Sequence, residues 1–346
     1  MPASLIKKMK IGIGLLIFAL IGTTYAQEVF NQELEAIYLK NIKQLTFPSM
    51  NFEKAGEAYF SPDDKDIVFQ AVPTGQQNYQ IYSMNLRENV PAMISTGKGA
   101  CTCAYFRPDG HKIIFASSHE DPDLSDTNRS SNPSSQQSGS YKWDLTPYMN
   151  IYEANCDGSH LLPLTKGSAY HAECAYSPDG MKIVYASNED GSMNIYTMNA
   201  DGSDVQQLTH TTQFYNGGPF FSPDGSKIIF RSDRQRPDYL QIYIINSDGS
   251  NEQQLTFNEA VNWAPYWHPN GKIIAFTTSL HGHRHYEIYL LNVETGVQSR
   301  LTHCSVFDGL PVFSNDGTKL LWTSKRGIDN TCQIFIGDFI VPPELN

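Results

Sequence analysis

The sequence has little of what several common protein classes need. Lysine and arginine total 25 against 36 aspartate and glutamate residues, so the formal net charge is −11. A nucleic acid or an anionic membrane binds to a positive surface, and we therefore expect neither as a partner. No Gly-x-Ser-x-Gly elbow occurs, which argues against a serine hydrolase. No segment repeats apolar residues every 3.6 positions, which excludes a stack of helical repeats.

Long apolar runs are also scarce, and one lies near the N-terminus, from Ile11 to Ile21, after three lysines. Thr24-Tyr25-Ala26 then offers a small-x-small cleavage site. This order predicts a secretory signal peptide over residues 1–26. About a dozen apolar residues are too few for a membrane anchor. We expect cleavage near Ala26, export to the periplasm or out of the cell, and no membrane insertion afterwards.

The cysteines are few and show no zinc-ribbon spacing; they are Cys101, Cys103, Cys156, Cys174, Cys304 and Cys332. In an oxidising compartment six cysteines can form up to three disulfides. Their spacing dictates no pairing, and several lie in predicted strands, where a free cysteine behaves as a small buried apolar residue. Both alternatives stay open at this point.

What the sequence does contain is a repeat. Ala175-Tyr-Ser-Pro-Asp-Gly-Met-Lys-Ile-Val-Tyr, Asn194-Ile-Tyr-Thr-Met-Asn-Ala-Asp-Gly and Gln206-Gln-Leu-Thr recur almost unchanged about 45 residues later. The proline of the turn, or its equivalent, lies at Pro62, Pro108, Pro178, Pro223, Pro269 and Asn315. The spacings are 46, 70, 45, 46 and 46 residues, which gives six copies and one insertion.

Each copy reads as four short strands. Pro-Asp-Gly suits a tight turn between the first two, and Asp-Gly-Ser between β-rich runs predicts a hairpin joining the last two. Units of this period and composition are typical of propeller blades, which remove exposed sheet edges by closing into a ring. The sequence therefore predicts an all-β fold, a six-bladed β-propeller of four-stranded blades.

The two ends of the chain predict how the ring closes. Asn41-Ile-Lys-Gln-Leu-Thr-Phe reads as a fourth strand without a blade, and the last copy lacks its own fourth strand. We predict that this N-terminal strand completes the last blade. The domains are then the signal peptide, a short and partly helical segment at 27–40, the propeller at 41–340 with an insertion at 119–148, and a tail at 341–346.

The connections predict which face carries function. The Pro-Asp-Gly and Asp-Gly-Ser turns lie on one face and are expected to be too tight to build a pocket. The longer, varied connections lie on the other, as does the insertion, and seven of the ten histidines fall in these connections. Loops on a rigid scaffold are the usual place for binding.

Aligning the copies also predicts a polar ring at the channel mouth of that face. Six residues before each turn-opening position lie Ala55, Cys101, His171, Asn216, Asn262 and Asp308, and four before it lie Glu57, Cys103, Glu173, Gly218, Ala264 and Leu310. Regular strand alternation places both rows on one side. The predicted ligand-binding residues are Glu57, His171, Glu173, Asn216, Asn262, Trp263 and Asp308. The alternative is that these groups only bond to neighbouring loops.

One stretch, His281-Gly-His-Arg-His285, predicts a metal site. Histidines two positions apart on an extended segment point to one side, and neutral imidazole is a common metal ligand. We name His281, His283 and His285 as candidate ligands for a divalent metal, with solvated loop histidines as the alternative.

Ser177-Pro-Asp-Gly-Met-Lys-Ile-Val-Tyr-Ala-Ser, Ile195-Tyr-Thr-Met-Asn-Ala-Asp-Gly and Gln207-Leu-Thr resemble the repeat of the TolB-type, WD40-like β-propeller family of bacterial envelopes. The resemblance implies the propeller fold. TolB itself carries an α/β domain before its propeller, and this sequence resembles the propeller only, so the Tol–Pal partners are not carried over.

From these observations we expect an exported, monomeric and non-enzymatic propeller that binds a protein, peptide or glycan on its loop-rich face. The alternative is a metal-dependent carbohydrate-active enzyme that resembles the oligogalacturonate lyases.

Overall fold

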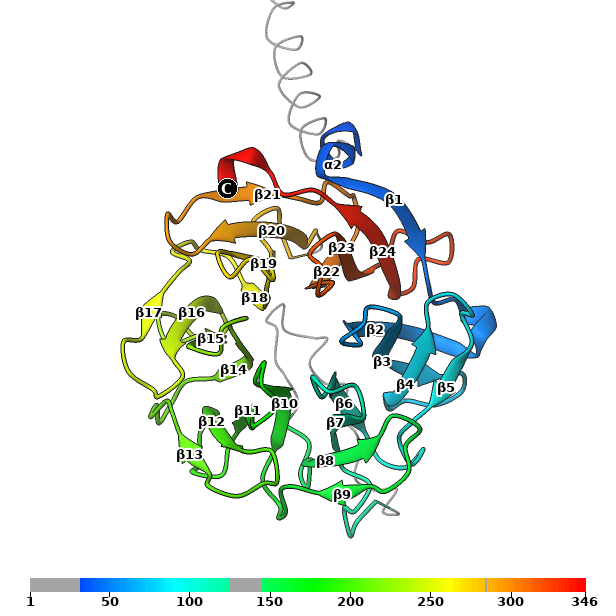
Figure 1. Ribbon diagram of the computed structural model, residues 1–346, viewed down its shortest axis with the longest axis vertical. Coiled ribbons are helices and arrows are strands. Elements are labelled where there is room, and N and C mark those ends of the chain that lie inside the picture. The colour runs from blue at the N-terminus through cyan, green and yellow to red at the C-terminus, as the bar shows by residue number, and fades with distance from the viewer. Residues whose placement is uncertain (1–31, 125–144, 284) are drawn as a thin grey trace, which may run out of the picture.

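A computed structural model describes residues 32–124, 145–283 and 285–346, and the predicted signal peptide lies outside these ranges. Six four-stranded antiparallel sheets stand around a central axis like the blades of a propeller (Figure 1). The first strand of each blade is the innermost, and β2, β6, β10, β14, β18 and β22 surround the axis. The predicted fold class and number of blades are confirmed.

The blades follow one another along the chain, and the first five keep their strands in sequence order. Blade one contains β2 (Phe52–Phe60), β3 (Asp66–Pro73), β4 (Gln80–Asn85) and β5 (Pro91–Met93). Blade two contains β6 (Cys101–Phe106), β7 (Lys112–Ser117), β8 (Asn150–Asn155) and β9 (Leu162–Pro163). Blade three contains β10 (His171–Tyr176), β11 (Lys182–Ser187), β12 (Asn194–Asn199) and β13 (Gln206–Gln207). Blade four contains β14 (Asn216–Phe221), β15 (Lys227–Ser232), β16 (Gln241–Asn246) and β17 (Gln253–Gln254). Blade five contains β18 (Asn262–Trp267), β19 (Ile273–Thr278), β20 (Glu287–Asn292) and β21 (Gln298–Arg300).

The sixth blade confirms the predicted ring closure. It combines β22 (Asp308–Phe313), β23 (Lys319–Ser324) and β24 (Gln333–Phe339) with the N-terminal strand β1 (Leu39–Gln44). Strand β1, blue in Figure 1, runs antiparallel to the red β24, with Leu39 opposite Phe339 and Gln44 opposite Phe335. Thr46 follows β1 and accepts a hydrogen bond on Oγ1 from the Ile334 amide at 2.9 Å. The Leu-Thr signature at the start of the chain therefore belongs to the last blade.

The same hydroxyl bond recurs around the ring and explains why Leu-Thr ends five of the six blades. In blade one Ile94-Ser95 takes this place, and the Ser95 hydroxyl accepts from the Ile81 amide at 3.0 Å. In blade three Thr209 Oγ1 accepts from the Ile195 amide at 2.9 Å, and in blade four Thr256 Oγ1 accepts from the Ile242 amide at 2.9 Å. The outermost strands are only two or three residues long in the first five blades, so their backbone alone offers few bonds. The hydroxyl satisfies a buried amide that these short strands leave open.

The Pro-Asp-Gly turns form as their residue types require. Gly180 adopts φ +70°, the left-handed region that glycine enters at little cost. Asp179 accepts bonds from the Ser177 hydroxyl at 2.6 Å and from the Met181 amide at 3.0 Å. Since each first strand runs into such a turn, its other end lies at the face with the longer connections. We call the two sides the turn face and the loop-rich face.

The core lies between neighbouring sheets. The second strand of each blade is almost fully buried, with Phe69, Phe115, Phe230 and Phe276 all 0% exposed at equivalent positions. These rings and the aliphatic side chains beside them fill the wedge between consecutive blades. The result is a rigid ring that holds the innermost strands at fixed positions around the axis.

The segments outside the blades are short. The predicted N-terminal segment contains the helix α2 (Gln32–Tyr38), and β1 begins directly after it, slightly earlier than expected. The 3-10 helix η1 (Pro48–Met50) leads into β2. In the tail, η3 (Pro343–Leu345) buries Leu345, whose carbonyl accepts a bond from Asn292 Nδ2 at 3.0 Å. In the described part of the chain, no helix is long and apolar enough to cross a membrane.

All six cysteines lie within the described residues and all six are free thiols in this structure. Cys101, Cys103 and Cys174 are buried, and Cys156, Cys304 and Cys332 are partly exposed. Of the two alternatives that the sequence left open, the structure contains free thiols, and the three that lie in the innermost strands are buried.

Candidate functional site

A left-handed bulge interrupts the innermost strand of every blade. The residue four positions before each turn has a positive φ, between +49° and +58°, and the ladder with the second strand shifts register there. These residues are Glu57, Cys103, Glu173, Gly218, Ala264 and Leu310. Five of the six carry a side chain, although this conformation costs such a residue roughly 1 kcal/mol. A bulge turns a side chain toward a new direction.

The bulges build a chamber around the axis. All six bulge residues line one cavity of about 40 Å³ near the loop-rich face, together with Arg231 and Trp263. None of the residues two positions earlier, the row from Ala55 to Asp308, lines it. The expectation that strand alternation would place both rows on one surface is therefore wrong, because the bulge lies between them.

Aromatic rings close the channel below the chamber. Tyr59, Tyr105, Phe220 and Tyr266 come from four different blades, and their ring centroids lie between 5.1 and 6.1 Å apart. The hydroxyls of Tyr105 and Tyr266 lie 3.2 Å from each other across the axis. This aromatic layer forms the floor of the chamber and separates it from the turn face.

Glu173 and Arg231 form a buried ion pair in the chamber wall, with Arg231 Nη2 3.0 Å from Glu173 Oε1. Tyr215 donates its hydroxyl to the same oxygen at 2.7 Å, and the backbone amide of Gly218 donates to Oε2. The guanidinium also lies over the Tyr215 ring, 5.5 Å from its centroid. Glu173 is thus neutralised and bonded on both oxygens, as a buried carboxylate needs to be.

The Glu173 bond to Gly218 replaces one that threonines make elsewhere. The bulge amide of Leu310 donates to Thr277 Oγ1 at 3.0 Å, and that of Glu57 donates to Thr323 Oγ1 at 3.1 Å. Blade three has Ala186 at the matching position, so no hydroxyl is present there. Glu173 therefore supports the neighbouring blade as well as lining the chamber.

Glu57 differs from Glu173 in its surroundings. Its side chain is partly exposed, and its carboxylate accepts a bond from the Tyr59 hydroxyl at 3.2 Å. Burial raises the pKa of Glu57, and the charge of Glu173 adds to the rise, while the Cys103 thiol and Arg231 oppose it. Glu57 is a carboxylate in the chamber whose nearby guanidinium is already bonded to another acid.

Three of the predicted binding residues serve the connections behind the chamber. His171 is 5% exposed, with Nδ1 2.9 Å from the Ser187 hydroxyl and Nε2 3.2 Å from Glu189. Asn216 and Asn262 are fully buried and donate to oxygens of their own loops, at 2.6 Å to Thr211 and 2.8 Å to Asn258. These contacts match the alternative reading, in which the polar groups tie neighbouring loops together.

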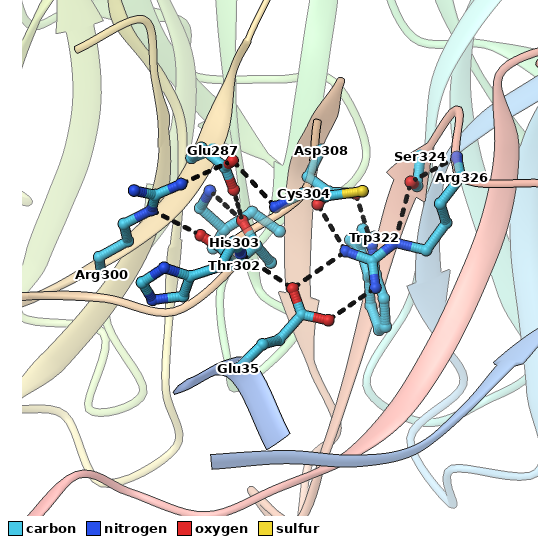
Figure 2. Close-up of polar contacts among 11 residues, drawn as sticks. Glu35, Glu287, Arg300, Thr302, His303, Cys304, Asp308, Trp322, Ser324 and Arg326 are labelled. Atoms are coloured by element: carbon cyan, nitrogen blue, oxygen red, sulfur yellow. Dashed lines mark hydrogen bonds and ion pairs between the residues drawn. The ribbon is translucent and has the colours of Figure 1, made fainter. Parts of the chain in front are cut away.

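Asp308 has a similar role at the junction with the N-terminal helix, shown in Figure 2. It is fully buried and accepts bonds from Trp322 Nε1 at 3.1 Å and Arg326 Nη2 at 2.5 Å. Arg326 also donates from Nη1 to Glu35 of α2 at 2.8 Å. The sequence did not indicate this pair, because Glu35 and Arg326 lie at opposite ends of the chain.

Glu287, which the sequence suggested only as a possible third metal ligand beside the histidines, is another buried carboxylate in Figure 2. Glu287 accepts bonds from Thr302 Oγ1 at 2.5 Å, from Arg300 Nη2 at 2.9 Å and from the Cys304 amide at 3.1 Å. Burial raises its pKa to about 8, and Asp308 adds to the rise. The other five blades have an amide side chain at this position, namely Gln80, Asn150, Asn194, Gln241 and Gln333. Glu287 thus places a carboxyl group where the other blades have an amide.

The candidate metal ligands contact three different partners. His281 Nε2 lies 2.9 Å from the Tyr289 hydroxyl, His283 Nδ1 lies 3.4 Å from the Tyr286 hydroxyl, and His285 Nδ1 lies 3.0 Å from the Ser305 carbonyl. Across the described residues, no three His, Cys, Asp or Glu side chains gather closely enough to hold a metal ion. The divalent metal at these histidines stays a prediction from the sequence.

The turn face is not flat, contrary to the expectation that tight turns leave no pocket. A hollow of about 320 Å³ lies on the turn side of the aromatic layer. The prolines of five turns and the aromatic residues preceding them line it, with Tyr105, Phe220 and Tyr266 at its base. Aromatic residues and prolines dominate its lining, which contains no charged side chain.

Comparisons with known proteins agree with this architecture. The family model described as TolB beta propeller domain matches residues 173–285. A solved chain assigned to TolB from Agrobacterium tumefaciens is 22% identical, with a TM-score of 0.58 and coverage of 83% of this chain and 91% of that one. TolB from Acinetobacter baumannii is 18% identical, with a TM-score of 0.53 and coverage of 83% and 64%.

Oligogalacturonate lyase from Vibrio parahaemolyticus is similar to the same degree in fold, with 13% identity, a TM-score of 0.55 and coverage of 88% and 94%. No curated protein matches the sequence. At these identities the solved structures share the fold, and the chamber residues have to be interpreted from their own chemistry.

Proposed function

Taking the chain as a TolB-like six-bladed β-propeller, we propose that it is an exported, non-enzymatic binding protein. Its ligand, a protein, peptide or glycan, docks on the loop-rich face and reaches the chamber with a part of its surface. Export rests on the leader-like sequence of residues 1–26.

The observation that carries the proposal is the chamber itself. Charged and aromatic side chains from different blades converge there, with Glu57, Arg231 and Trp263 in its lining. Convergent polar groups beside aromatic rings are typical of ligand sites. A cavity of about 40 Å³ is too small for a whole ligand, so most of the contact would be made by the surrounding loops.

Site-specific photo-crosslinking in the native cell tests the proposal. A photoreactive amino acid is placed either at Glu259, exposed on the loop-rich face, or at Met181, which is 64% exposed on the turn face. We expect a discrete crosslinked species from position 259 and none from position 181. Crosslinks from position 181 only, or from neither position, would contradict the proposal.

The alternative, a metal-dependent carbohydrate-active enzyme, has the shared fold of oligogalacturonate lyase as its support. Measuring metal content in the purified protein separates the two. A stoichiometric divalent metal that His283→Ala removes would favour the enzyme, since the binding function requires none.

A further inference from the structure

The two carboxylates of the chamber differ in how they are neutralised. Glu173 bonds to Arg231, Tyr215 and Gly218 on its two oxygens. Among the described residues, the carboxylate of Glu57 is given hydrogen bonds by the Tyr59 hydroxyl and the Cys103 thiol, and by no cation. Glu57 is therefore the chamber carboxylate that no guanidinium group is bonded to among the described residues.

Glu57 has no evident task in holding the fold together. The bulge bond at this position uses the Glu57 backbone amide, which donates to Thr323, and leaves the side chain out. Glu173, by contrast, supplies the bond that orders the next bulge. Burial of the Glu57 carboxyl group is unfavourable without a counter-ion.

The size and lining of the chamber limit what can approach Glu57. Its volume of about 40 Å³ holds a group of only a few heavy atoms. Tyr59, Tyr266 and Trp263 contribute aromatic surface, which attracts a cation at the face of a ring. A compact ammonium group satisfies both conditions, whereas a sugar ring needs more room.

We propose that the chamber binds a primary ammonium group of the ligand, a lysine side chain or a free N-terminus, with Glu57 as its counter-ion. This inference rests on the proposed function and specifies which part of the ligand enters the chamber. The incoming cation lies beside the Glu57 carboxylate and favours its ionised form.

The test uses n-butylammonium as the probe, with n-butanol as its neutral counterpart and calcium, magnesium and manganese chlorides as metal probes. Binding to the full-length protein is followed at neutral pH by NMR of the glutamate carboxyl carbons, with the Glu57 signal assigned by its loss in Glu57→Gln. We expect a saturable shift of that signal with n-butylammonium and none with n-butanol. Equal binding of the two, or a shift with a metal ion only, would overturn the proposal.

Two variants complete the design, with binding followed by calorimetry. Glu57→Gln should weaken n-butylammonium binding at least tenfold, whereas Glu259→Gln, an exposed carboxylate on the same face, should leave it unchanged. Unchanged binding in Glu57→Gln would overturn the proposal. If Glu57→Gln does not fold, Glu57→Asp keeps the charge and should retain saturable binding. If position 259 crosslinks but n-butylammonium does not bind, this inference alone is refuted. If position 259 does not crosslink, the proposed function is refuted.

Discussion

Asp64 and Asn315 hydrogen-bond to each other where the first blade meets the last. Asp64 Oδ1 accepts from the Asn315 amide at 2.9 Å and from Asn315 Nδ2 at 2.6 Å. Both residues depart from the repeated turn, since Asp64 stands at the glycine position and Asn315 at the proline position. The turn sequence is thus altered at the seam of the ring, where the alteration makes a bond between the two blades.

Restoring the repeat at this seam should therefore destabilise the protein. Asn315→Pro removes the amide and the side-chain donors to Asp64, and we expect a loss of about 1–3 kcal/mol in the free energy of unfolding. Asn270→Asp, which restores the repeat in blade five away from the seam, should change it by less than about 0.5 kcal/mol. Denaturant unfolding measures both changes. A stabilised Asn315→Pro protein would contradict the claim that the bond between Asp64 and Asn315 stabilises the seam.

Ring closure by the N-terminal strand gives a second prediction. Thr46→Val keeps the shape of a fully buried side chain and removes the acceptor for the Ile334 amide, at a cost of about 1–3 kcal/mol. Thr209→Val makes the same change inside blade three and should cost a similar amount.

Deleting residues 27–47 should lower the unfolding midpoint sharply and cause aggregation, since it exposes the edge of β24. A normal midpoint after deletion would mean that the ring closes in another way.

Glu287 should make stability depend on pH. Its pKa rises from 4.5 to about 8 on folding, so the unfolded chain releases the proton first as the pH increases. Its contribution is complete below about pH 4.5 and is lost by about pH 8, a decline of roughly 1–4 kcal/mol. Glu287→Gln should remove this slope, and Glu259→Gln should keep it. Parallel pH profiles of wild type and Glu287→Gln in thermal unfolding would disprove the assignment.

Asp308 and His171 should affect folding more than binding. Asp308→Ala leaves Arg326 buried with half of its partners, and we expect a loss of about 3–5 kcal/mol. His171→Ala should cost less, since its partner Glu189 is exposed. Calorimetric unfolding of each variant measures this, and an unaltered midpoint for Asp308→Ala would make a ligand-binding role for that residue the better explanation.

The repeat predicted the fold because the turns, the strands and, in most copies, the threonine of the fourth strand have nearly the same sequence. Gln44-Leu-Thr46 matches the fourth strand of the repeat and so predicted the closing strand. The chamber was harder to predict. Regular alternation was assumed through the innermost strands, and the bulge residues Glu57 and Ala264 are not the glycines that would reveal left-handed backbone. Arg231 could have been found, since the aligned copies have Gln70, Ala116, Ala186, Thr277 and Thr323 there.

Contacts between distant parts of the chain set the remaining limit. Glu35 and Arg326 meet only because the ring brings both chain ends together, and no local pattern encodes that meeting. The role of Glu173 likewise depends on Ala186 lacking a hydroxyl beside the neighbouring bulge.

Filling the chamber tests the account most directly. Ala264 lines it and makes no side-chain hydrogen bond, so Ala264→Met occupies the space while the polar contacts remain. The photoreactive amino acid at position 259 reports docking on the loop-rich face in the same cell. We predict that Ala264→Met reduces the crosslink yield at least tenfold with the unfolding midpoint nearly unchanged. An undiminished yield from a folded Ala264→Met protein would contradict the chamber as the ligand site.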